Sequence, residues 1–152
     1  MKILHTIPSM GILSGGPIFS TWLTVQGERM LGIDSLILAY DVYSKGDSNI
    51  TTESYLLLIP SSVDKKFLYS NSYSKALSKS DVDLFHIQGI WQYPTLSSVL
   101  CAKRKHKPYI ITLRGMLYPQ ALKKSFLWKK IVLCLYLKFS LQHASCLHDT
   151  CS

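Results

Sequence analysis

Three short segments combine glycine, histidine or arginine with a preceding apolar run, and these residue types suit the binding of an anionic ligand. They are residues 14–17, residues 86–94 and the pair Arg114 and Gly115. Glycine lets backbone N–H groups approach a ligand closely, and a guanidinium group matches the geometry of phosphate oxygens. Because the carboxyl ends of parallel strands meet at one sheet edge, where ligands bind, the sequence predicts a phosphate-binding site at that edge.

The first segment contains Gly15 and Gly16, followed by Pro17, which suits the first turn of a helix. A helix N-terminus attracts anions, so this loop could bind phosphate. It is neither a GxGxxG fingerprint nor a Walker loop, since no Gly-Lys-Ser/Thr follows. A turn that simply requires a positive φ explains the glycines equally well, and both interpretations stay open.

The second segment places polar side chains near the end of an apolar strand. His86 and Gln88 alternate onto one face of that strand, and Trp91 and Tyr93 lie in the loop after it. The aromatic rings could stack on a sugar or a lipid isoprene unit, or they could cover the sheet edge. A histidine inside a strand is more often a structural residue than a ligand-binding one, so a binding role for His86 is the less frequent case.

The net charge of +8 favours anionic partners such as phosphorylated small molecules, an acidic membrane face or nucleic acid. We expect no nucleic-acid partner, because no aromatic-rich RNA-binding strand is present. Residues 123–130 form a basic cluster before the apolar run 131–141, which is too short to span a bilayer. This region fits either a core helix, which we favour, or an interfacial helix touching anionic lipid.

Strands and helices alternate along the chain, which predicts an α/β fold with a parallel sheet flanked by helices. At 152 residues the chain is the size of one domain. Expected strands span residues 2–9, 33–39, 55–59, 84–88, 109–113 and 145–148, and expected helices span 17–31, 70–79, 93–105 and about 119–142. We expect residues 41–54 to form a surface loop and 55–59 to be a buried strand.

The cysteines give no sign of a metal site. They are Cys101, Cys134, Cys146 and Cys151, with no CxxC pair and no metal-ligand spacing to histidine. We therefore predict buried free thiols and no metal or other cofactor.

At these motifs the chain resembles the N-terminal domain of family 4 glycosyltransferases, the retaining GT-B enzymes of bacterial surface-polysaccharide assembly. Any one matching segment is weak evidence, but the ordered set is fairly specific and covers nearly the whole chain. The matching segments are residues 3–8 with 14–17, then 86–94, 108–117, 128–130 and 144–150.

The resemblance implies a Rossmann-like domain that binds the acceptor and forms one wall of a cleft. It places Gly15, Gly16, Arg114 and Gly115 near the donor diphosphate, and it places His86, Gln88, Trp91 and Tyr93 on the acceptor side. Relatives in the subgroup with an Arg-Gly-Met-Leu motif often carry a second histidine where this chain has Gln88. No catalytic residue is predicted.

The resemblance further implies that a second Rossmann-like domain, which this sequence lacks, holds most of the nucleotide-sugar. We therefore expect residues 1–152 to be a partial, acceptor-side domain that is inactive as an isolated chain. The complete enzyme would transfer a sugar from a nucleotide-sugar, as a substrate, to a lipid-linked or glycan acceptor. It would act in the cytoplasm or at the inner face of the membrane.

Two other classes remain open. The first is a non-catalytic binding module that pairs with a separately encoded half or with another transferase. The second is a small flavodoxin-like protein, which the lack of a Ser/Thr-rich phosphate loop after the first strand counts against.

Overall fold

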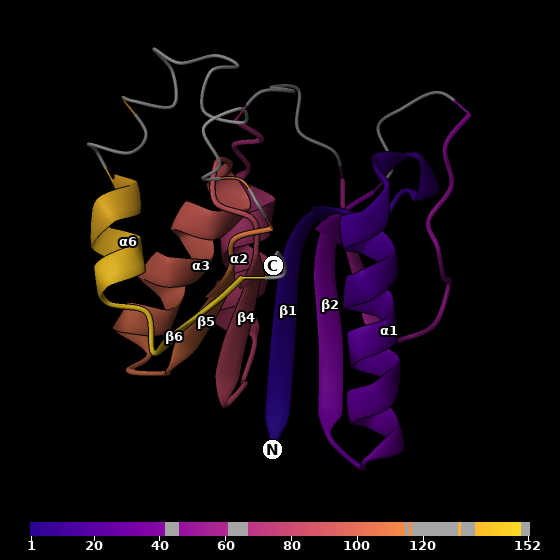
Figure 1. Cartoon of the computed structure of the whole chain (residues 1–152), viewed down its shortest axis with the longest axis horizontal. Coiled ribbons are helices and arrows are strands. Elements are labelled where there is room, and N and C mark those ends of the chain that lie inside the picture. The colour runs from indigo at the N-terminus through magenta and orange to yellow at the C-terminus, as the bar shows by residue number, and fades with distance from the viewer. Residues whose placement is uncertain (42–45, 61–66, 115, 117–130, 132–135, 150–152) are drawn as a thin grey trace.

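The chain folds around a single parallel sheet with helices on both faces (Figure 1). The computed structural model describes residues 1–41, 46–60, 67–114, 116, 131 and 136–149. The strands are β1 (Lys2–Ser9), β2 (Asp34–Tyr40), β3 (Leu56–Ile59), β4 (Leu84–Gln88), β5 (Tyr109–Thr112) and β6 (Cys146–His148). The helices are the 3₁₀ turn η1 (Ile12–Ser14), α1 (Gly16–Met30), α2 (Asn71–Lys79), α3 (Tyr93–Arg104) and α6 (Lys138–Gln142).

The sheet has the strand order β3-β2-β1-β4-β5-β6, and every neighbouring pair is parallel. The order reverses between β1 and β4, because the chain builds outward in one direction and then crosses back to build in the other. In open α/β sheets, ligands bind outside the carboxyl ends of the strands at such a reversal. The loops that follow β1 and β4 are therefore the part of the fold most suited to a site.

The helices divide unevenly between the two faces. Helix α1 packs over β1 and β2, whereas α2, α3 and α6 lie on the opposite face, as Figure 1 shows. Two hydrophobic clusters follow this division. The larger one contains Tyr73, Phe85 and Ile87 on the α2 and α3 side, and the smaller one contains Ile18 and Val25 under α1.

Local signals in the sequence set the ends of the helices. Ser70 caps α2, where its hydroxyl accepts a hydrogen bond from the Tyr73 N–H. Pro17 and Pro94 lie in the first turns of α1 and α3, where a missing N–H costs nothing. Gly32 follows α1 with a φ of 80°, the left-handed conformation that commonly ends a helix.

The expected α/β fold is confirmed, and each described strand lies within one residue of its predicted range. Two expectations were wrong. The segment predicted as a buried strand, β3, is an edge strand with Leu57 and Leu58 each 40% exposed. Cys146 is exposed, whereas Cys101 is buried as expected. Of the helical region predicted near 119–142, the described part contains α6, and the rest lies outside the described residues, as do Cys134 and Cys151.

No helix in the described part of the chain has both the length and the apolar character needed to cross a bilayer.

Ile87 tests the assignment of the hydrophobic core. Its side chain is fully buried in the larger cluster, so we expect Ile87→Ala to lower the free energy of unfolding by about 2–5 kcal/mol. Leu23→Ala, at a position 60% exposed on α1, is the matched control and should change it by less than about 0.5 kcal/mol. Urea unfolding measures both, and equal effects would contradict the assignment of the core.

Candidate functional site

The loop after β1 presents an open surface at the start of α1. Gly15 has a φ of 88°, a conformation that other residues adopt only with strain, so the positive-φ interpretation of this glycine is confirmed. A Cβ built on Gly15 or Gly16 would meet no atom of the described residues within 4 Å. The Gly16 N–H has no hydrogen-bond partner among the described residues. The loop therefore has room for a ligand. It also offers the Gly16 N–H, at the N-terminus of α1, as a free hydrogen-bond donor.

Arg114, just after β5, contacts the second turn of α1 and the end of β4. Its Nε and Nη2 donate to Gln88 Oε1 at 3.1 and 2.6 Å, which ties it to the end of β4. Nη2 also donates to Thr21 Oγ1 at 3.0 Å, and Nη1 donates to Ser20 Oγ, both on α1. The backbone of Arg114 has a φ of 53°, which is uncommon outside glycine and marks a constrained position.

The two hydroxyls are oriented to accept from Arg114. Ser20 Oγ and Thr21 Oγ1 both donate to the Pro17 carbonyl oxygen, at 3.2 and 2.8 Å. Their hydrogens are thus used within the first turns of α1, and their lone pairs remain for the guanidinium group. Three segments far apart in the sequence are joined at one point of the sheet edge.

The charge at this point is not neutralised. No carboxylate in the described part of the chain forms an ion pair with Arg114. Burial lowers the pKa of Arg114, but a guanidinium group stays charged at neutral pH. The N-terminus of α1 also carries a partial positive charge. Through its contacts with Ser20 and Thr21, the guanidinium group therefore lies within two helical turns of this positive helix end.

His86 lies on the same face of β4 as Gln88, as the alternation predicted. Its Nε2 shares a hydrogen bond of 2.8 Å with Thr112 Oγ1 on β5. Burial, and then the charge of His5, lower the pKa of His86 to about 4, so its ring is neutral at pH 7.

A buried contact between β1 and α1 was missed by the sequence reasoning. His5 is fully buried, and its Nε2 lies 2.8 Å from Glu28 Oε2, which also accepts from Ser35 Oγ at 2.6 Å. Burial acts to raise the pKa of Glu28, but the hydrogen bonds from His5 and Ser35 outweigh it and the pKa is lowered. A sequence signal existed, because His5 alternates with Ile3 and Ile7 and therefore points to the α1 face.

Two residues predicted for the acceptor side lie elsewhere in the fold. Tyr93 is the first residue of α3, and its hydroxyl shares a hydrogen bond of 2.5 Å with Ser74 Oγ on α2. Its ring packs against Tyr69, on the side of the sheet opposite α1. Trp91 packs against the larger hydrophobic cluster. Of the predicted residues, the structure joins Arg114 to Gln88, and it joins Arg114 to Ser20, which lies one helical turn after Gly16. Gly115 lies outside the described residues.

His86 makes stability depend on pH. Its pKa is about 4 in the folded chain against 6.5 in the unfolded one, so the unfolded chain binds more protons between these values. We expect the free energy of unfolding to fall by up to about 3 kcal/mol as the pH drops through this window. Denaturant unfolding at about pH 7 and about pH 4 measures it.

In His86→Gln this loss should shrink, whereas His143→Gln, at an exposed histidine next to α6, should leave it unchanged. The lowered pKa of Glu28 acts in the same direction below 4.5, so a smaller residual loss remains in the His86 variant. If the pH dependence of stability were unaltered in His86→Gln, protonation of His86 would not be its cause.

Comparison with known proteins identifies the fold. No family model and no curated protein sequence matches the chain. Among solved structures, it is similar to an alpha-glucosyltransferase in complex with UDP and a 13-mer DNA containing a HMU base, with a TM-score of 0.65 and 12% identity over 98% of this chain and 37% of that one. It is also similar to the UDP-GlcNAc 2-epimerase from Methanocaldococcus jannaschii, with a TM-score of 0.57 and 16% identity over 97% of this chain and 38% of that one. The chain thus has the Rossmann-like fold of these proteins and spans less than two fifths of their length.

Proposed function

We propose that this chain forms one wall of a glycosyltransferase cleft and contacts the diphosphate of a nucleotide-sugar. The observation that carries the proposal is the Arg114 guanidinium group, held by neutral partners at the N-terminus of α1 without a carboxylate among the described residues. Two positive groups at one edge repel each other unless an anion lies between or beside them. A diphosphate supplies that anion.

The donors left over at this edge suit phosphate oxygens. A guanidinium group has five N–H donors. Gln88, Ser20 and Thr21 take four of them, which leaves one Nη1 N–H of Arg114 together with the Gly16 N–H. Charge-assisted hydrogen bonds of this kind are the strong ones, and their geometry is set before the ligand arrives.

Such a site would act through positioning and electrostatics. In sugar transfer, the bond between the sugar carbon and the donor phosphate breaks, and negative charge grows on the departing diphosphate. A fixed cation and a helix N-terminus stabilise charge that develops there. The acceptor hydroxyl oxygen forms the new bond to the sugar carbon, and its proton passes to the departing diphosphate. Gln88 acts as a positioning residue, because its amide oxygen holds Arg114.

The comparisons support the class of ligand. The names of both structural neighbours include UDP, one as a bound molecule and one as part of a nucleotide-sugar. Because this chain spans less than two fifths of either neighbour, we assign it the diphosphate contact and the acceptor side. A second Rossmann-like domain would hold the nucleotide. The acceptor would be a lipid-linked or glycan molecule on the side of His86, near the inner face of the membrane.

Binding of UDP to the chain tests the proposal by calorimetry. We expect Arg114→Lys to weaken UDP binding about tenfold or more, because a charge-assisted hydrogen bond contributes about 1.5–3 kcal/mol and lysine lacks the planar fork. The control is Arg104→Lys, at the exposed end of α3, which should bind UDP like the unaltered chain.

Uridine provides the second comparison, since it lacks the diphosphate. We expect uridine to bind far more weakly than UDP and to be insensitive to Arg114→Lys. Equal affinities for uridine and UDP, or UDP binding that Arg114→Lys leaves unchanged, would show that Arg114 does not hold a diphosphate. Circular dichroism of each variant separates a lost contact from a lost fold.

A further inference from the structure

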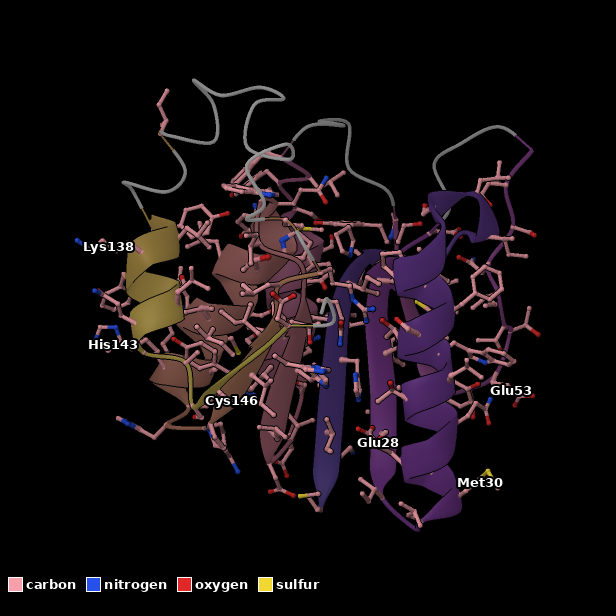
Figure 2. The ribbon with its side chains drawn as sticks, in the orientation of Figure 1. Glu28, Met30, Glu53, Lys138, His143 and Cys146 are labelled. Atoms are coloured by element: carbon pink, nitrogen blue, oxygen red, sulfur yellow. The ribbon has the colours of Figure 1, made fainter. Side chains whose placement is uncertain are left out.

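A second group of polar side chains lies away from the sheet edge, between α1 and the middle of the sheet. His5 on β1, Glu28 on α1 and His86 on β4 each offer one ligand atom, and these atoms all lie within 4.8 Å of one another. Glu28 lies on the side of α1 that faces the sheet (Figure 2). We propose that these three side chains bind a divalent transition-metal ion of the zinc class. This inference does not depend on the proposed function.

The fold brings the two histidines together. β1 and β4 pair in parallel, with His5 directly opposite His86 in the register. Both side chains point to the α1 face, and their ring centroids are 4.7 Å apart. Glu28 reaches them from near the end of α1. The three ligands come from separate elements, so no short sequence motif predicts that they lie together.

The donor set is one that zinc prefers. Two imidazole nitrogens and one carboxylate oxygen, with a further position left for water, form a common arrangement around this ion. Zinc ligands lie about 2.0–2.2 Å from the ion, which in a tetrahedral site places them about 3.3–3.6 Å from one another. The widest separation in the cluster would therefore close by up to about 1.5 Å, and the 2.8 Å contact between His5 and Glu28 would open. Glu28 and His86 are only partly buried, which gives an ion a way in from solvent.

Neighbouring hydroxyls hold two of the ligands in place. Ser35 Oγ donates to Glu28 Oε2 at 2.6 Å, and Thr112 Oγ1 lies 2.8 Å from His86 Nε2. With Nε2 engaged by Thr112, the Nδ1 atom of His86 remains for the ion. Metal-binding histidines and carboxylates commonly have such outer partners, which fix the ring orientation and raise affinity.

The test uses the tag-free chain, first treated with a chelator and then titrated with Zn²⁺ by calorimetry and with Co²⁺ by visible absorption. We expect saturable binding of one ion per chain and a Co²⁺ absorption band typical of coordination by nitrogen and oxygen. Zn²⁺ should also raise the midpoint of thermal unfolding, because an ion that binds the folded chain stabilises it.

The variants Glu28→Gln and His86→Gln should each weaken Zn²⁺ binding at least about 100-fold, in line with the loss of one ligand from three. Both replacements keep hydrogen-bonding groups, and circular dichroism without metal checks that they fold. His143→Gln, at an exposed histidine, is the matched control and should bind like the unaltered chain.

His148→Gln identifies the competing explanation, a surface site on β6, where Cys146 and His148 are exposed. Loss of binding in His148→Gln, with Glu28→Gln and His86→Gln unaffected, would overturn the proposal. So would the absence of any saturable Zn²⁺ or Co²⁺ binding to the folded chain.

Discussion

The parallel pairing of β1 with β4 is the contact on which the rest of the structure depends. It joins the two halves of the sheet at the point where the strand order reverses. The helices of these two halves cover opposite faces of the sheet. The carboxyl ends of these strands then flank the place where a loop from β1 and a polar side chain from β4 can meet. The same pairing sets His5 opposite His86. The next pairing, of β4 with β5, brings Gln88 within reach of Arg114.

Arg114 shows how the fold maintains an arrangement that is costly by itself. Its backbone adopts a left-handed φ, and its half-buried guanidinium group has no carboxylate partner among the described residues. Hydrogen bonds to Gln88, Ser20 and Thr21 offset part of the cost of burial. Neutral partners leave the positive charge available to a ligand, whereas a carboxylate would cancel it. Strain and uncancelled charge together are the physical grounds on which we propose a ligand at Arg114.

Sequence patterns located the elements well, because turn residues, caps and apolar periodicity act locally. The alternation in β4 correctly placed His86 and Gln88 on one face. It did not reveal that Gln88 contacts Arg114, because that contact depends on how neighbouring strands align. Glu28 could not be found, since the rotation of α1 against the sheet is set by packing. The position of β3 could not be predicted, because an apolar run does not distinguish a central strand from an edge strand.

Helix α1 is held by polar contacts at both of its ends. Ser20 and Thr21 near its start contact Arg114, and Glu28 near its finish contacts His5. A rigid displacement of this one helix would alter both ends at once. Ligands that fasten either end would therefore be thermodynamically coupled through the position of α1, and such coupling is reciprocal by necessity. Helix α1, which covers one face of the sheet, would then also connect ligand binding at its start with ligand binding at its finish.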